Sequence, residues 1–508
     1  FNLIYINMYL LESIGTALID WSRAQFALTA CYHWLFVPLT LGLALIMALM
    51  ETQYVRTGEA FWKDTARFWQ KLFGINFAVG VATGLILEFE FGTNWSNYSW
   101  FVGDIFGAPL AIEGIVAFFM ESTFIGVMFF GWDKVGRGFH LASTWLTGIG
   151  ATLSAWWILV ANSWMQHPVG MELNPLTVRS EMTDFFAVAF APEAAMKFLH
   201  TVSSGWLTGA VFVVAVSSWF LLRGRNVRTA MASMRIAAVT GLVSGLIVMG
   251  TGDQSGVNIA KGQPMKLAAA EGLRQGGQQA PFSIVPGVEV PGMLSMLATH
   301  DFNGYVPGID NLLDGYTAPD GTEHLSAEEK MQRGKLAVQA FSKLRAMQGD
   351  TLATPEEQAV ANKEYKENLP YFGYGFISDK EQLVPPVWLV YWSFRIMVGT
   401  GMALMLLFVL VAWFSRKKGN LAERRWLLHA GMWCLPLAYL GGQAGWIVAE
   451  VGRQPWAIQD LLPVNAAVSS LSPQAVQTTF FIFLALFTAL LFVELRIMFK
   501  AIREHKAE

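Results

Sequence analysis

Between Val102 and Asp133 the chain reads VGDIFGAPLAIEGIVAFFMESTFIGVMFFGWD, an apolar run long enough to cross a lipid bilayer as a helix. Glu113 and Glu121 interrupt this run. A charged side chain at membrane depth costs on the order of 2.5–3.5 kcal/mol on insertion scales, so such residues rarely persist without a partner. The stretch therefore predicts a membrane helix that carries a functional site.

The composition of the whole chain agrees with a membrane protein. Of the 508 residues, 54% are hydrophobic and only 14% are charged, whereas soluble globular proteins carry about 25% charged residues. The net charge of −3 predicts no nucleic-acid partner. Cys31 and Cys434 lie in apolar runs and are predicted to be packing residues. No basic residue precedes Arg23, which argues against a cleaved signal peptide, and the residues before Met8 are interpreted as an addition or a misassigned start.

Nine segments of the chain are long enough to span a bilayer, and the need to satisfy the backbone in lipid makes them helices. The predicted fold class is all-α, a polytopic membrane helical bundle with about nine transmembrane helices. A large periplasmic loop separates helices 6 and 7. The segments run over residues 26–50, 68–88, 105–131, 141–161, 198–222, 234–251, 386–414, 426–449 and 476–499.

The basic residues set the orientation of these helices. Lys and Arg concentrate in every second connection, namely 51–67, 132–140, 223–233, 415–425 and the C-terminal tail. The connections between them carry few. By the positive-inside rule the N-terminus is periplasmic and the C-terminus is cytoplasmic.

The long polar connection divides the chain into three parts. Residues 1–252 hold helices 1–6, residues 253–384 form the periplasmic loop, and residues 385–508 hold helices 7–9. Within the loop, Ser326 and Glu329 have capping-box spacing and predict a helix from about 327 to 347. The stretch TPEEQAVANKEYKENL (354–369) predicts a second helix. We expect a partly folded lid.

Four potential metal ligands share one depth in the outer layer of the membrane: His33, His200, Met397 and Glu450. Imidazole, thioether and carboxylate groups all ligate haem iron. Each residue alone is more often a packing or hydrogen-bonded core residue, and the chain has no CxxCH motif. The residues themselves leave a haem site and ordinary packing both open. Other histidines, such as His140, lie near cytoplasmic helix ends and are interpreted as structural.

Glu113 and Glu121 are eight residues apart, which in an α-helix is a rise of about 12 Å and a separation of about 80° around the axis. They are predicted to border one polar cavity and to relay protons or contact a cofactor, because an unpaired carboxylate there is costly.

Long motifs in nearly every span resemble subunit I of the cytochrome bd-type quinol oxidases. Besides 102–133 they are RAQFALTACYHWLFVPLTLG (23–42), KLFGINFAVGVATGLILEFEFGTNWS (71–96), LVANSWMQHP (159–168), KFLHTV (197–202), KLAAAEG (266–272), FRIMVG (394–399) and GWIVAEVGRQPWAIQDLLP (445–463). They occur in the order of the family.

The resemblance implies haem ligands. His33 and Glu450 resemble axial ligands of the two haems at the oxygen-reducing site. His200 and Met397 resemble the ligands of a low-spin haem b, with Arg395 at its edge. The implied cofactors are low-spin haem b, high-spin haem b, and haem d or a third haem b in its place.

The resemblance also implies the surroundings of these cofactors. Trp446 and Arg453 resemble residues packed against the high-spin haems. Lys266 and Glu271 resemble the quinol-contact pair of the periplasmic loop. Glu113 and Glu121 resemble carboxylates of the oxygen site and of its proton path.

The implied function is oxidation of ubiquinol or menaquinol near the periplasmic face and reduction of oxygen to water. Such an enzyme of the bacterial inner membrane separates charge without pumping. It pairs with subunit II and with small single-helix accessory subunits. Two alternatives stay open: a haem b quinol dehydrogenase that passes electrons to another acceptor, and a proton-coupled transporter. A haem count of three, fewer or none separates the three functions.

Overall fold

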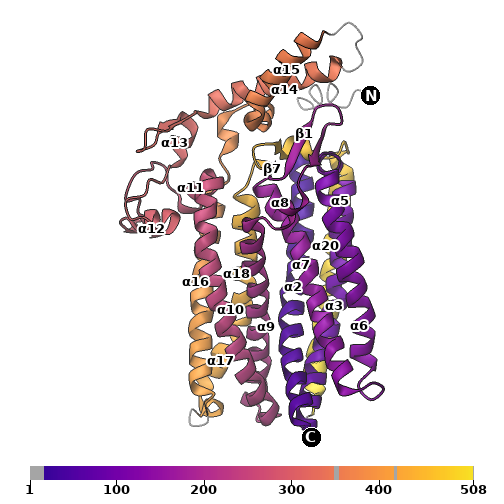
Figure 1. The fold of residues 1–508 in the computed structure, drawn as a ribbon. Coiled ribbons are helices and arrows are strands. Elements are labelled where there is room, and N and C mark those ends of the chain that lie inside the picture. The colour runs from indigo at the N-terminus through magenta and orange to yellow at the C-terminus, as the bar shows by residue number, and fades with distance from the viewer. Residues whose placement is uncertain (1–15, 348–353, 417–419, 507–508) are drawn as a thin grey trace.

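The structure, a computed structural model, describes residues 16–347, 354–416 and 420–506. Long helices lie side by side, and one end of the bundle carries a cap of short elements (Figure 1). The residues before Met8, interpreted above as an addition or misassigned start, lie outside the described residues.

Eight spans in the described chain are long and apolar enough to cross a membrane. The helices concerned are α2 (Thr16–Thr57), α3 (Ala60–Thr93), α5 (Gly103–Ile112) with α6 (Phe119–Phe130), α7 (Arg137–Gln166), α8 (Phe185–Ala189) with α9 (Pro192–Leu222), α10 (Val227–Gly262), η3 (Lys380–Leu383) with α16 (Val387–Phe414), and α20 (Pro473–Glu504). The all-α membrane bundle predicted from the sequence is confirmed.

The predicted span 426–449 differs from the others because it is two helices, α17 (Arg425–Trp433) and α18 (Leu435–Val451). Pro436 lies in the first turn of α18 and lacks the N–H that a continuous helix would need. The predicted third span is interrupted too, by the π-helix η1 (Glu113–Phe118) between α5 and α6. The separation of about 80° between Glu113 and Glu121 assumed an unbroken α-helix and therefore does not hold.

The connections 51–67 and 223–233, predicted as loops, are largely helical. Only Gly58 and Glu59 separate α2 from α3, and α10 already begins at Val227. The reason is length: the 42 residues of α2 rise about 63 Å, whereas the apolar core of a bilayer is about 30 Å thick. The helices therefore continue past the membrane into segments that hydropathy alone does not recognise.

The cap contains both helices that were predicted within 253–384. Ser326 and Glu329 form the expected reciprocal hydrogen bonds at the start of α14 (Ala327–Met347). Thr354 and Glu357 do the same for α15 (Pro355–Asn368). The other cap elements are α11 (Pro264–Glu271), α12 (Met293–Thr299), α13 (Ile309–Asp314) and η2 (Leu369–Phe376).

Strands are short and pair as antiparallel hairpins. They are β1 (Met171–Asn174) with β2 (Arg179–Met182), β3 (Phe282–Val285) with β4 (Val288–Val290), β5 (Tyr316–Thr317) with β6 (Glu323–His324), and β7 (Trp456–Ile458) with β8 (Leu462–Pro463). The remaining short helices are α4 (Ser96–Phe101), η4 (Leu421–Glu423) and α19 (Val464–Ala467).

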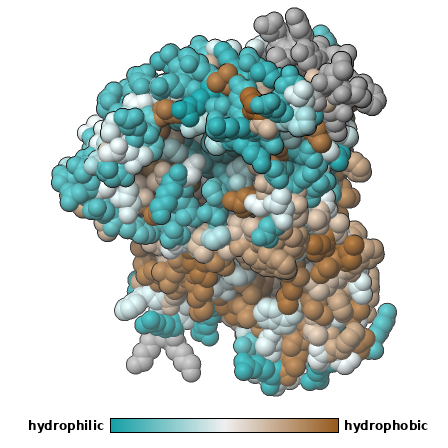
Figure 2. All heavy atoms as spheres, turned by 45° about the horizontal axis from the view of Figure 1, so that its top comes forward, coloured by the Kyte–Doolittle hydropathy of each residue, from teal (hydrophilic) through white to brown (hydrophobic). Residues whose placement is uncertain are grey.

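The largest apolar core lies between α2, α3, α9, α10 and α16. Gly42 and Gly209 let α2 and α9 touch, since a Cβ atom on Gly42 would lie 2.5 Å from Gly209 Cα. Both cysteines are free; Cys434 packs against this core as predicted, whereas Cys31 is exposed and is not a packing residue. Figure 2 shows a broad apolar belt beneath the hydrophilic cap, as a membrane-embedded bundle requires.

Candidate functional site

His33 lies on α2 and points its ring at α3. Its Nδ1 atom lies 3.0 Å from the hydroxyl of Thr83. A Cβ atom on Gly84 would lie 2.9 Å from His33 Cε1, so this glycine makes room for the ring. Within the described chain Nε2 has no hydrogen-bond partner, so this nitrogen is available to coordinate a metal. An imidazole anchored at one nitrogen and open at the other is the arrangement of a metal-ligating histidine.

His200 on α9 repeats this arrangement. Its Nδ1 atom lies 3.1 Å from the carbonyl of Val248 and 3.1 Å from the hydroxyl of Thr251, both on α10. Met397 lies on α16, which packs against α10, and its sulfur would be 3.1 Å from a Cβ atom on Gly445 of α18. Imidazole and thioether lie here on two helices, α9 and α16, that both pack against α10, and this donor set fits a low-spin haem.

Glu450 and Trp446 lie one turn apart on α18. The Trp446 and Trp34 rings meet edge to face with centroids 5.1 Å apart, which brings this part of α18 next to the residue after His33. The Glu450 carboxylate accepts hydrogen bonds from Asn162 at 3.0 Å and from Gln166 at 3.3 Å, and it forms an ion pair with Arg453. A carboxylate offers about four acceptor positions, so one stays open for a further ligand.

Glu113 and Glu121 both face α7. The hydroxyl of Ser154 donates to Glu113 at 2.6 Å. Glu121 packs over Gly150, where a Cβ atom would lie 2.6 Å from Glu121 Cγ. The structure thus brings the two carboxylates to one helix, and the π-helix that begins at Glu113 sets their relative direction. π-helices of this kind are frequent at functional sites.

Lys266 on α11 is only 2% exposed. Its Nζ atom donates to Gln166 and to Gln263, both at 2.7 Å. Burial lowers the pKa of Lys266 well below its usual value, and repulsion from Lys197 adds to this effect. Two acceptors match the two N–H groups of a neutral amine, whose lone pair then stays free.

Glu271, at the other end of α11, has different neighbours. It forms a buried ion pair of 2.7 Å with Arg395 of α16. Arg395 also donates to the carbonyls of Ala270 and Ser283, and its guanidinium lies 3.8 Å from the centre of the Tyr391 ring. Burial raises the pKa of Glu271, and the charge of Arg395 opposes that shift. Lys266 and Glu271 are thus held by separate networks.

Sequence reasoning missed the residues that orient these groups. Thr83 and Thr251 fix the two histidine rings, and Asn162 and Gln166 hold Glu450. In the motif LVANSWMQHP, Asn162 and Gln166 are four positions apart and therefore lie one turn apart on the same helix face. This amide pair was the sequence signal that could have identified the two residues. A further acidic side chain on α3 is Glu90. It is buried and accepts a hydrogen bond from Thr29 at 2.5 Å.

Comparisons with known proteins identify the family and the fold of this chain. The sequence model of the family described as cytochrome bd terminal oxidase subunit I matches residues 21–506. The chain is 43% identical over 520 residues to cytochrome bd-II ubiquinol oxidase subunit 1 of Escherichia coli K12, covering 96% of each. It is 36% identical to cytochrome bd ubiquinol oxidase subunit 1 of Bacillus subtilis 168, covering 88% of this chain and 85% of the relative.

A solved structure has the same fold. The bd oxidase from Geobacillus thermodenitrificans superposes with a TM-score of 0.78 at 22% identity, covering 97% of this chain and 99% of that one. The match to the family spans every element that carries a candidate ligand. The chain therefore belongs to the family of cytochrome bd terminal oxidase subunit I.

Proposed function

We propose that this chain is the haem-bearing subunit of an electrogenic quinol oxidase, which takes electrons from ubiquinol or menaquinol and reduces oxygen to water. The observation that carries the proposal is the shared arrangement of His33 and His200: each ring is anchored at Nδ1 and open at Nε2. Two such imidazoles fit haem iron at two separate positions. A transporter that used only the carboxylates would have no need of them.

The residues divide among three haems. His200 and Met397 would hold low-spin haem b, while His33 and Glu450 would each hold one of two further haems, high-spin haem b and either haem d or another haem b. The haems supply electron transfer and oxygen activation. Trp446 would pack beside this second site, and Arg453 keeps the Glu450 carboxylate charged and oriented.

The quinol site would lie at α11. Each quinol gives up two electrons and two protons. Lys266 in its neutral form is a proton acceptor for one hydroxyl group, because its lone pair is free while Gln166 and Gln263 hold its two N–H groups. Glu271, held by Arg395, would accept a hydrogen bond from the other end of the quinol ring or take its proton.

Protons for water would come from the opposite side. Reduction of one oxygen molecule consumes four electrons and four protons, and two quinols supply the electrons. Glu121 of α6 would pass protons to Glu113, which directly follows α5 and is hydrogen-bonded to Ser154. Helix α5 lies nearer the cap than α6 does (Figure 1). Quinol protons would leave on the side of the cap. This separation of charge needs no pump.

The orientation and the partner follow from the same scheme. The cap would be periplasmic, with the N-terminus on the same side and the C-terminus cytoplasmic. Helices α6 and α20 expose most of their apolar surface. Subunit II and small single-helix subunits would cover part of this surface, and lipid the rest.

The test is a haem count combined with a substrate assay. The purified complex should give three haems per complex, a low-spin signal in the reduced-minus-oxidised spectrum, and oxygen uptake driven by quinol. Three haems without quinol-driven oxygen uptake would refute an oxidase. Two haems would favour a dehydrogenase, and none would favour a transporter.

A further inference from the structure

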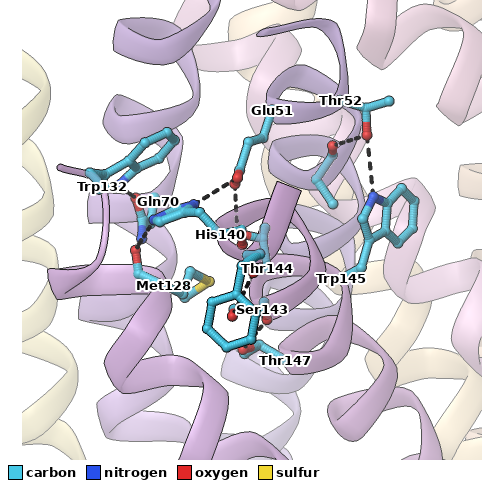
Figure 3. Close-up of polar contacts among 12 residues, drawn as sticks. Glu51, Thr52, Gln70, Met128, Trp132, His140, Ser143, Thr144, Trp145 and Thr147 are labelled. Atoms are coloured by element: carbon cyan, nitrogen blue, oxygen red, sulfur yellow. Dashed lines mark hydrogen bonds and ion pairs between the residues drawn. The ribbon is translucent and has the colours of Figure 1, made fainter. Parts of the chain in front are cut away.

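A second polar cluster lies at the end of the bundle opposite the cap (Figures 1 and 3). Its centre is an ion pair between Glu51 of α2 and His140 of α7, whose Oε1 and Nδ1 atoms are 2.7 Å apart. Both side chains are only 2% exposed. Neither residue was singled out from the sequence as functional, and neither contacts the candidate haem ligands.

The hydrogen bonds around this pair determine how many protons it holds. His140 Nε2 lies 3.0 Å from the carbonyl of Met128, which only accepts, so Nε2 carries a hydrogen. Thr144 donates its hydroxyl hydrogen to Glu51 Oε2 at 2.6 Å. One further proton must therefore lie between Nδ1 and Oε1. The pair is either imidazolium and carboxylate or imidazole and carboxylic acid, and a small movement of one proton converts them.

A polar stripe leads from this pair to the proposed proton relay. On α7, His140, Thr144, Thr147, Gly150 and Ser154 follow one another about a turn apart and thus share one face. Thr144 and Thr147 are buried. Gly150 contacts Glu121, and Ser154 donates to Glu113. The stripe therefore begins at the Glu51–His140 pair and ends at the carboxylates of helices α6 and η1.

The other side of the pair faces charged groups of the bundle end. The Trp132 ring lies against the His140 ring with centroids 4.0 Å apart. Lys63 and Arg67 both lie 5.9 Å from the centre of the same Trp132 ring, and Lys63 pairs with exposed Asp133 at 2.7 Å. Arg137 lies over Tyr54 at 5.0 Å. One aromatic layer thus separates the buried pair from the ionisable surface.

We propose that the Glu51–His140 pair is the proton-loading station of this chain: it takes up a proton from the face opposite the cap and passes it along α7 to Glu121. The inference rests on the proposed function, which requires protons from that face. Stability alone gives little reason for the pair, because replacing a buried ion pair by well-packed apolar residues of similar volume is often neutral or stabilising.

The test uses the complete oxidase complex in vesicles. Reduced complex is mixed with oxygen while a pH-sensitive dye follows proton uptake and absorbance follows haem oxidation. Glu51→Gln keeps the shape of the side chain but cannot hold the shared proton, so proton uptake should slow at least 10-fold while haem content and quinol-driven haem reduction stay normal. The solvent isotope effect on turnover should rise, because proton delivery becomes limiting.

The matched control is Thr52→Val. Thr52 is the neighbour of Glu51 and also bonds to α7, accepting from Trp145 Nε1 at 3.2 Å, but it lies outside the polar stripe (Figure 3). Its loss should leave proton uptake and the isotope effect unchanged.

Thr147→Val provides a second variant that conserves volume, for the case that Glu51→Gln does not assemble. It should slow proton uptake several-fold. Proton uptake at the rate of the unmodified complex in an assembled Glu51→Gln, or in Thr147→Val, overturns the inference. If the unmodified complex itself fails to reduce oxygen with quinol, the proposed function is wrong instead.

Discussion

Lys266→Met is the change that tests the proposed quinol site most directly. Methionine keeps the length of the side chain but removes the amine. The carbonyl oxygens of Gln166 and Gln263 then lose a donor at 2.7 Å each. A buried acceptor left without a donor costs about 1–3 kcal/mol. Removal of the amine also removes the cost of burying that amine, which offsets part of this loss. The fold should therefore survive.

The catalytic effect should be larger than the effect on stability. Loss of a positioned proton acceptor typically slows a reaction about 100- to 10,000-fold. We expect kcat/KM for quinol to fall at least 100-fold, while oxygen uptake driven by an artificial one-electron donor stays near normal. The control is Lys261→Met, which removes an exposed cation in the last turn of α10 and should change neither rate.

The pH dependence supplies a second, independent readout. The pKa of Lys266 is lowered in the folded protein, so the reactive neutral amine becomes more abundant as pH rises through that lowered pKa. The unfolded chain keeps its proton up to about pH 10.4. Between the two pKa values the unfolded state binds more protons, so stability should rise with pH. Lys266→Met should remove both trends. An unchanged kcat/KM with an unchanged pH profile would refute the reasoning.

Three further changes test the rest of the site. Met397→Leu nearly conserves volume and should cost less than about 1.5 kcal/mol, yet the low-spin haem signal should disappear or its potential fall; an identical spectrum and potential would remove Met397 as a ligand. Glu450→Gln leaves Arg453 buried without its counter-charge and should destabilise the complex by about 3–5 kcal/mol, in addition to losing a haem; a melting temperature equal to that of the unmodified complex would contradict this. Glu121→Gln should slow turnover and the build-up of membrane potential at normal haem content, and normal charge separation would leave Glu121 without a relay role.

The helices and the cap were predictable because the determining signals are local. Hydropathy predicts each span, and the capping-box pair Ser326 and Glu329, which lies within four residues of sequence, predicts the start of α14. The break between α17 and α18 at Cys434 also has a local signal, the proline two residues later. A proline within an apolar run, however, does not by itself show whether the helix bends or ends and begins again. The candidate ligands were recognised by family resemblance, since their depth alone left packing open.

The partners of the site were not predictable, because they depend on which helices touch. Glu51 and His140 are 89 positions apart, and each alone resembles an ordinary ionisable residue at the end of a membrane helix. Arg395 and Glu271 are 124 positions apart. Only the packing of α2 against α7, and of α16 against α11, makes these residues into pairs.

Arg395 also determines how the protein can vary. It binds α11 through Ala270 and Glu271, and the β3 hairpin through Ser283, while Met397 follows it two residues later on α16. The part of the cap proposed to bind quinol and the thioether proposed to bind iron are therefore attached to the same turn of α16. A cap transplanted from a relative should function only if the matching stretch of α16 is transplanted with it, so that these two distant regions are inherited as one unit.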